Sequence, residues 1–300
     1  MNLGYACINM TLRKKNITTN RSMIKRTFQQ KGIEYASELG IQNVRDLIEI
    51  IKWNHKNGIN FFRTTSNLFP WASEYNLSDM PHYHRIKNLL NGAGHLAKKY
   101  NQRITAHPGP FNVLVSPNEN VVKNTITDLS IHGEVFDMMG LSHTPYNKLN
   151  IHCNGVYGDK KSAMDRFCKN FERLPYSVQS RLTVENDDKA SMYSVKDLMY
   201  IHQRIGIPIV FDYHHHRFCP GDLSERAAVE LAASTWPEGI TPCFHYSESR
   251  SEEKNDPKIR PQAHSDYVYQ KIETYGYDLD IVVEAKHKEL AVEKYYQIHG

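Results

Sequence analysis

Six short apolar runs in this chain each end in a histidine or a carboxylate, the side chains that bind metal ions and move protons. The clearest run is 281–283, which leads directly into Glu284. An apolar run that ends in a polar residue is typical of a buried parallel strand that delivers a side chain to a site. The ends of the other runs carry His107, His152, Glu185, Asp212 with His215, and His245.

Together with His264, these residues offer imidazole nitrogens and carboxylate oxygens but no thiolate. This donor set suits zinc, manganese, iron or a mixture, and eight donors are more than one ion requires. Glu185 could bridge two ions about 3.5–4 Å apart, an arrangement that activates water and stabilises in-line phosphoryl displacement. Asp212 and His215 have a D-x-x-H spacing that puts both on one rim, whereas at most two of the three histidines 214–216 can point inward. The predicted metal ligands are His107, His152, Glu185, Asp212, His215, His245, His264 and Glu284, with Glu185, Glu284 and His245 as the catalytic candidates.

Eight strand-like runs alternate with helix-like segments, which predicts a parallel sheet with one helix after each strand. The strands are expected at 3–8, 60–65, 103–107, 148–153, 181–186, 208–214, 241–247 and 278–286. The helices are expected at 44–57, 82–100, 120–140, 160–174, 194–205, 223–236 (after an N-cap at Asp222), 264–275 and 288–298. Eight units without a spare element or linker favour an α/β fold: a single (β/α)8 TIM barrel domain over residues 1–300. No GxGxxG follows the first strand, so no nucleotide cofactor is expected.

Composition narrows the class of protein further. The chain has 300 residues, 40% of them hydrophobic, and a formal net charge of only +4. Its five cysteines form no CxxC pair, and no apolar stretch of about 18 residues exists, so we expect a soluble, intracellular protein in a reducing compartment. A basic run, 13–31, follows the first strand, where barrel enzymes build substrate sites; it is either a solvated loop or a contact for the phosphate backbone.

Motifs spread over all eight units give the chain a family resemblance. They read LGYACIN, WNHKNGINFFRTTSNLFP, HPG, NIHCNG, LTVEND, FDYHHHR, FHYS, AHSDYV and VVEAKHKE in chain order. With them the chain resembles the UV-damage endonucleases along nearly its whole length. The resemblance implies a (β/α)8 nuclease with up to three divalent ions, manganese first and zinc or magnesium as alternatives. It implies incision immediately 5′ of UV photoproducts in double-stranded DNA, and the eight predicted ligands match the family's ligand positions.

The resemblance also implies substrate contacts, and it shows departures. Tyr5 and Asn9 match positions beside the damaged nucleotides or the scissile phosphate. The family's Gln and Tyr after HPG are replaced by Pro110 and Phe111; Phe111 can still wedge into a base stack. Members of the family have a histidine after the second strand, and this chain has Glu74 near that position. At Cys243 the family commonly has a lysine, so a thiolate or a water would have to substitute there.

Three alternatives stay open from the sequence. An abasic-site endonuclease of the endonuclease IV type would share the fold, the metals and the chemistry. A metal-dependent sugar isomerase or epimerase would use the same barrel but predicts a small closed pocket without a basic rim. A non-catalytic DNA-binding descendant is suggested by Cys243 and Pro110. In the leading interpretation Lys258 and Arg260 join the basic run on backbone phosphates, Trp71 engages unstacked bases, and the protein is a monomer.

Overall fold

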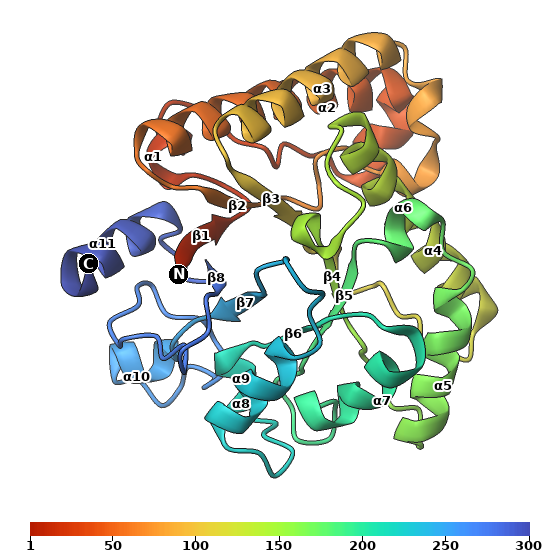
Figure 1. Cartoon of the computed structure of the whole chain (residues 1–300). Coiled ribbons are helices and arrows are strands. Elements are labelled where there is room, and N and C mark those ends of the chain that lie inside the picture. Colours follow the sequence, from red (N-terminus) through yellow and green to blue (C-terminus); the bar gives the residue numbers. More distant parts are fainter.

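The computed structural model describes residues 1–300, in which eight parallel strands form one sheet that curls into a barrel (Figure 1). The strands are β1 (Asn2–Ala6), β2 (Phe61–Thr64), β3 (Arg103–Ala106), β4 (Leu149–His152), β5 (Leu182–Glu185), β6 (Ile209–Val210), β7 (Cys243–Tyr246) and β8 (Asp280–Val283). The sheet runs β6-β5-β4-β3-β2-β1-β8-β7, and a parallel bridge between Asp212 and His245 joins its two edges. The predicted barrel is confirmed.

Helices surround the barrel. They are α1 (Met10–Arg13), α2 (Lys25–Lys56), α3 (Tyr83–Lys99), α4 (Glu119–Met138), α5 (Lys160–Phe171), α6 (Tyr176–Gln179), α7 (Val195–Ile205), α8 (Tyr213–His216), α9 (Glu225–Ala233), α10 (Arg250–Lys254) and α11 (Glu289–His299). Three short 3₁₀ turns complete the set: η1 (Ala72–Glu74), η2 (Leu77–Asp79) and η3 (Pro145–Asn147). None of the helices combines the length and the apolar character needed to cross a membrane.

Side chains alternate between the two faces of the barrel wall, as the period of two in a strand requires. Outward residues pack against helices: Tyr5 meets the ring of Phe62 and donates its hydroxyl to Asn54 of α2 at 2.7 Å. Inward residues are unusually polar. Arg103 of β3 reaches across the barrel to Asp280 of β8 at 2.8 Å, and both are buried. This ion pair fills the amino-terminal end of the barrel, so the interior is packed rather than open.

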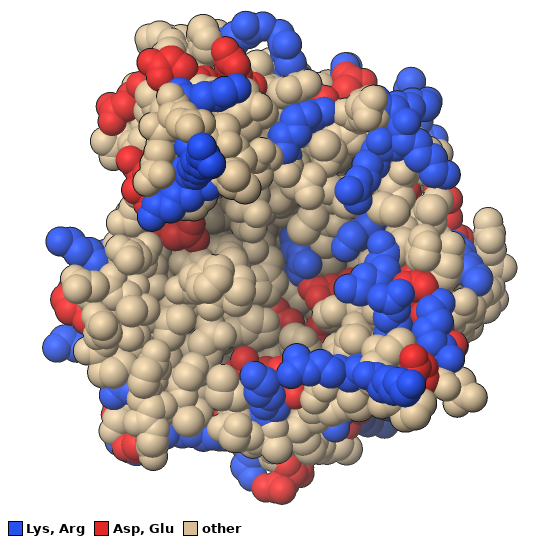
Figure 2. Space-filling model, turned by 180° about the vertical axis from the view of Figure 1, so that it is seen from behind, with Lys and Arg blue, Asp and Glu red and all other residues tan.

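The two ends of the barrel can be told apart in the figures. Elements follow one another clockwise in Figure 1, and right-handed strand–helix–strand connections then place the amino ends of the strands toward the viewer. Figure 2, seen from behind, therefore looks onto the carboxyl ends of the strands. Its surface is hollowed near the centre, acidic atoms are visible within the hollow, and Lys and Arg side chains gather along one side of it.

Two predicted helices differ from the structure. The helix expected at 44–57 is the second part of a longer helix, α2, which starts at Lys25. This helix is kinked at Gly32, where φ is 64°. Residues 25–31 of the basic run are thus helical, and Arg21 is held by Asp46 at 2.6 Å rather than free.

The helix expected at 264–275 is absent. Buried Val268 and Ile272 have a helical spacing, but the backbone amides of Tyr269 and Gln270 donate to Glu248 at 2.7 Å each. A carboxylate that binds successive amides offers an alternative to helical hydrogen bonds, so this segment stays a loop.

Two smaller differences concern the sixth unit. The strand is only two residues long, since Asp212 already serves as the N-cap of α8 and accepts from His215 N at 2.8 Å. The next helix is capped by Ser224, not by Asp222, whose φ of 62° places it in the preceding turn. The short strand therefore ends just before the predicted ligands Asp212 and His215, which lie at the start of α8.

Candidate metal centre

All eight predicted ligands lie in one network at the carboxyl ends of the strands, with Glu185 at its centre. One Glu185 oxygen, Oε2, lies 3.1 Å from His107 Nε2 and 3.8 Å from His152 Nε2. The other, Oε1, lies 3.1 Å from His245 Nδ1 and 3.4 Å from His215 Nδ1. Glu185 is 1% exposed. Four histidines from four different segments therefore surround one buried carboxylate.

Glu284 connects the remaining ligands. Its Oε1 lies 3.3 Å from His245 Nδ1, and its Oε2 lies 3.7 Å from His264 Nε2. Asp212 Oδ2 is 4.0 Å from His215 Nε2. The barrel thus gathers residues that are as far apart in sequence as His107 and Glu284, because strand ends converge on one face in this fold.

Two triads have the geometry to hold an ion. His107, His152 and Glu185 form one, and Glu185, Asp212 and His245 form the other; in each, one ligand atom per residue lies within 4.8 Å of the rest. Glu185 belongs to both, which suits a carboxylate that bridges two cations.

The buried polar atoms of these triads fit divalent ions. Asp212 Oδ2 and His245 Nδ1 are buried and make no hydrogen bond, although other polar atoms lie close by. Buried donors and acceptors in proteins nearly always have a partner, and a coordinated cation supplies one. The nitrogen and oxygen donor set suits manganese, zinc or iron.

Charges around the network keep its two central carboxylates ionised. Burial alone would raise the pKa of Glu185, but His245, His152 and the hydrogen bond from His107 outweigh it and hold that pKa well below its usual range. Burial acts on Glu284 in the same direction, and Arg63 and His245 outweigh it. Asp212 behaves differently: burial and the two neighbouring glutamates raise its pKa to about 7. The site therefore concentrates negative charge that invites cations.

Several residues of the network were missed by sequence reasoning. Lys148 lies wholly inside the barrel with Nζ 3.0 Å from His245 Nε2. Asn150 donates to Glu185 Oε2 and accepts from Thr183 at 2.8 Å. Lys148 and Asn150 precede the ligand His152 by four and two residues, so the period of two along the strand was the signal that could have found them.

Arg63 and Asp187 were also missed. Arg63 of β2 forms an ion pair with Glu284, and Asp187 Oδ1 lies 3.3 Å from His152 Nδ1. Burial on its own would lower the pKa of Arg63, but Glu284 raises it, so the guanidinium stays charged. The Arg63 guanidinium and the amine of Lys148, whose pKa is lowered by burial, thus border the ligand cluster from inside the barrel.

The expected substitutes for the family's lysine at Cys243 are a thiolate or a water, and the buried setting of this residue disfavours the thiolate. Cys243 is fully buried, and burial raises the pKa of its thiol above the ordinary value, so the group is neutral. The nearby amine comes instead from Lys148, which directly precedes β4.

The structure divides the five predicted substrate contacts into buried and exposed residues. Tyr5 and Asn9 are fully buried: Asn9 caps α1 and donates to the Tyr5 hydroxyl at 2.9 Å. Neither reaches the surface, so their substrate role stays a prediction. Phe111 is 88% exposed, next to Pro110 on the loop after β3. Glu74 is exposed in η1 and forms no ion pair with the ligand cluster.

An eight-stranded barrel with clustered histidines and carboxylates at its carboxyl end defines a (β/α)8 protein with a candidate metal centre. The particular family follows from comparison: the chain belongs to the UV-endonuclease UvdE family, whose model matches residues 1–298.

Two similar proteins carry names that match this family. A UV-damage endonuclease of Schizosaccharomyces pombe is 40% identical over 97% of this chain and 49% of its own length, so the chain spans about half of that relative. A putative UV-damage endonuclease of Acanthamoeba polyphaga mimivirus is 33% identical over 98% of this chain and 90% of its own.

Solved structures resemble the chain to different degrees. The crystal structure of SacUVDE matches with a TM-score of 0.83 at 29% identity, covering 99% of both chains. A D-psicose 3-epimerase from Clostridium cellulolyticum H10 matches with a TM-score of 0.55 at 12% identity, over 95% of this chain and 85% of its own. The second likeness concerns the barrel fold alone.

Proposed function

We propose that this chain is a metal-dependent DNA repair endonuclease that incises the phosphodiester bond immediately 5′ of UV photoproducts in duplex DNA. The observation that carries the proposal is the buried Glu185, shared between two ligand triads in a chain of the UvdE family. The barrel's buried apolar side chains form one contiguous cluster, which supports treating residues 1–300 as a single catalytic domain. Damaged double-stranded DNA is the proposed partner, and a monomer is the proposed form.

The proposed roles follow from position. His107 and His152 would hold one divalent ion with Glu185, and Asp212 and His245 would hold another with the same carboxylate. When bound, manganese, or alternatively zinc or magnesium, would lower the pKa of a water and neutralise charge on the phosphate. His215, His264 and Glu284 stand beside these residues and would supply ligands for a third ion.

Residues of the chain would then position the phosphate and the base stack. Arg63 sits at the rim of the cluster, where a guanidinium can bind phosphate oxygens in a bidentate manner. Phe111 stands exposed on the loop that begins at the ligand His107, so an aromatic wedge and the metal centre are joined by a short, proline-rich turn. This arrangement links distortion of the duplex to cleavage.

The test is incision of an end-labelled duplex with one cyclobutane dimer, in manganese and in chelator, beside abasic and undamaged duplexes. We expect a manganese-dependent cut just 5′ of the dimer and none in undamaged DNA. Cutting of the abasic duplex alone would favour the endonuclease IV type instead. Binding without cutting by metal-loaded protein would favour the non-catalytic alternative.

A sugar isomerase or epimerase is the remaining alternative. The epimerase structures support it only at the level of the fold, at 12% identity. The basic side chains along one side of the hollow in Figure 2 favour a polyanion over a neutral sugar. The absence of binding and cutting on all three duplexes would revive this alternative.

A further inference from the structure

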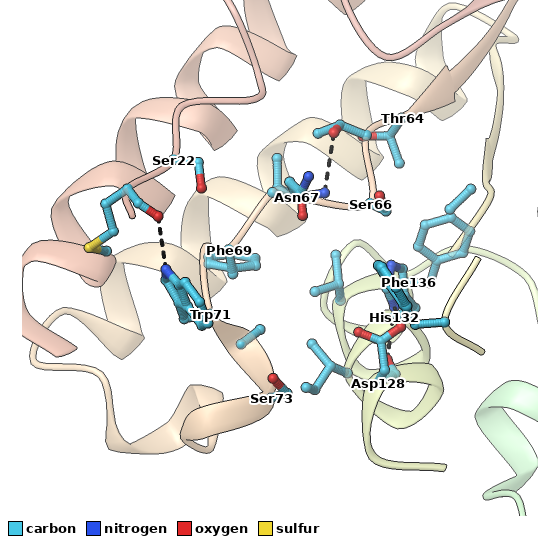
Figure 3. A pocket seen from close by; sticks show the side chains of 18 residues that line it. Ser22, Thr64, Ser66, Asn67, Phe69, Trp71, Ser73, Asp128, His132 and Phe136 are labelled. Atoms are coloured by element: carbon cyan, nitrogen blue, oxygen red, sulfur yellow. Dashed lines mark hydrogen bonds and ion pairs between the residues drawn. The ribbon is translucent and has the colours of Figure 1, made fainter. Parts of the chain in front are cut away.

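A polar pocket opens on the outer side of the barrel wall, at the carboxyl ends of β6 and β7. It is distinct from the cavity in Figure 3, whose walls include Phe69 and Trp71 and are largely apolar. Three glutamates line the polar pocket, Glu225, Glu248 and Glu252, and we call it the acidic pocket. Its volume of about 280 Å³ lies close to the lower end of the ~300–1,000 Å³ that is usual for ligand sites.

The acidic pocket lies behind the metal centre. On β7, His245 points to Glu185, whereas the next residue, Tyr246, lines the pocket. Ser247 joins the two sites, because it lines the pocket and its Oγ lies 2.7 Å from Nδ1 of the candidate ligand His264. A molecule in the pocket would therefore sit one hydrogen bond away from a candidate metal ligand.

The carboxylates of the acidic pocket are held in place one by one. Glu248 accepts from two backbone amides at 2.7 Å each, and Glu225 accepts from the Tyr275 hydroxyl at 2.8 Å. Glu252 forms an ion pair with Arg217, the only basic residue that lines the pocket. Glu225 and Glu248 have no cationic partner, so the pocket keeps two uncompensated negative charges. Because these carboxylates are already fixed, a cation that binds them loses little affinity to side-chain ordering.

Tyr246 directs a hydroxyl without a partner into the acidic pocket. The residue is 8% exposed, and its hydroxyl makes no hydrogen bond. Burial raises the pKa of this hydroxyl, and the charged groups that act on it, Glu248, Glu225 and Arg217, all line the pocket. The hydroxyl therefore stays protonated and faces these charges. Buried tyrosine hydroxyls usually have a hydrogen-bond partner, and a bound ligand would supply one here.

Charge and shape favour an organic cation over a metal ion in the acidic pocket. The groups of three histidine, cysteine or acidic residues that are close enough to hold an ion lie at the metal centre, so Glu225, Glu248 and Glu252 are too far apart to chelate one. The rings of Tyr213 and Tyr246 have centroids 5.4 Å apart and are inclined by 60°. Aromatic faces attract ammonium groups. A flexible chain that carries several ammonium groups satisfies the separated carboxylates and the rings together.

We propose that the acidic pocket binds a linear polyamine such as spermidine. Its ammonium groups lie against Glu225 and Glu248, one of them donates to the Tyr246 hydroxyl, and its methylene chain packs on Tyr213. Hydrogen bonds between an ammonium group and a carboxylate are among the strong ones in proteins, and the rings add cation–π attraction. This inference goes beyond the proposed function, because it adds a second ligand outside the metal centre.

Isothermal titration calorimetry of the manganese-loaded protein with spermidine tests the proposal. Manganese occupies the ligand cluster, so that spermidine does not bind to its carboxylates. Glu225→Gln removes a charge but keeps the acceptor for Tyr275, and Tyr246→Phe removes only the hydroxyl. Glu230→Gln is the matched control, because Glu230 lies on the same helix, α9, outside the pocket and pairs with Arg226.

We expect the wild type to bind one spermidine per chain. Glu225→Gln should weaken this binding roughly tenfold or more, and Tyr246→Phe roughly fivefold. Glu230→Gln should bind spermidine as the wild type does. Magnesium chloride at the same ionic strength should not displace spermidine.

No binding of spermidine by the wild type, or unchanged binding by both pocket variants, would overturn the proposal. Equal weakening by Glu225→Gln and Glu230→Gln, or displacement by magnesium, would overturn it too, since either result indicates nonspecific attraction to surface charge. No DNA takes part in this experiment, so its failure leaves the incision assay and the proposed function untouched.

Discussion

Consecutive residues of β2 and β3 face two very different environments. On the inner side of the wall, Arg63 and His107 join a buried cluster crowded with carboxylates, imidazoles and cations. On the outer side, Thr64 and Ala106 line a cavity that has aromatic walls and no lysine or arginine (Figure 3). Alternation along a strand thus places a polar ligand cluster and a largely apolar cavity on opposite sides of one sheet. The contrast predicts that substitutions on the inner side change metal binding, whereas those at the outer rim change the choice of DNA.

The largest effect should come from the centre of the inner side. Glu185→Gln removes the charge shared by both ligand triads, so we expect incision to fall by roughly a thousandfold or more and bound manganese to decrease. Metal content of the purified protein and single-turnover incision measure the two effects. An unchanged rate of incision would show that Glu185 is not a metal ligand in this protein.

The next largest effect concerns a residue that holds a ligand. Lys148 fixes His245 through Nε2, which keeps Nδ1 directed at Glu185 and Glu284. Lys148→Met should therefore weaken manganese affinity about 10–100-fold, as the loss of a residue that orients a metal ligand does. The melting temperature should not fall, because the substitution removes a buried amine and retains its apolar stem. Manganese titration followed by electron paramagnetic resonance measures the affinity, with exposed Lys56→Met as the control.

Equal manganese affinity in the Lys148→Met and wild-type proteins would mean that His245 keeps its orientation without the amine. The lysine would then serve only to fill the barrel beside Cys243.

At the outer rim we expect selectivity, not metal binding, to change. Phe111→Ala should weaken binding to dimer-containing DNA by about 1–3 kcal/mol and binding to undamaged DNA less, since stacking is lost only where the duplex opens. Stability should be unaffected because the side chain is 88% exposed. Fluorescence anisotropy on both duplexes tests this, with Tyr176→Ala, which is 70% exposed on α6, as the control. Equal losses on both duplexes would argue against a wedge.

The smallest functional effect is expected at Tyr5, an outward-facing wall residue. Tyr5→Phe removes the hydroxyl between Asn9 and Asn54, which should lower the free energy of unfolding by about 1–3 kcal/mol. The preference for damaged DNA should stay the same. Urea denaturation and the anisotropy assay separate the two outcomes, and a collapse of lesion preference at normal stability would restore Tyr5 as a substrate contact.

Local pattern was enough to predict the barrel and its eight candidate ligands. Buried runs such as Ile281–Val283 have a β-branched composition that indicates strands, and a polar residue after each run marks the carboxyl end. Helix boundaries were harder to predict from the sequence. The spacing of Val268 and Ile272 predicts a helix, but Glu248 binds two amides that the helix would use, 21 and 22 residues further along the chain.

The sequence by itself determined the order of the elements, the kind of chemistry and the set of candidate ligands, because these depend on composition and on periods of two and 3.6 residues. Only the tertiary structure decided which side chains share a site. Lys148 meets His245, Arg63 meets Glu284, and Tyr5 turns away from the surface. The physical reason is closure: distances across a barrel depend on how eight strands stagger and tilt together, and no local pattern records that geometry.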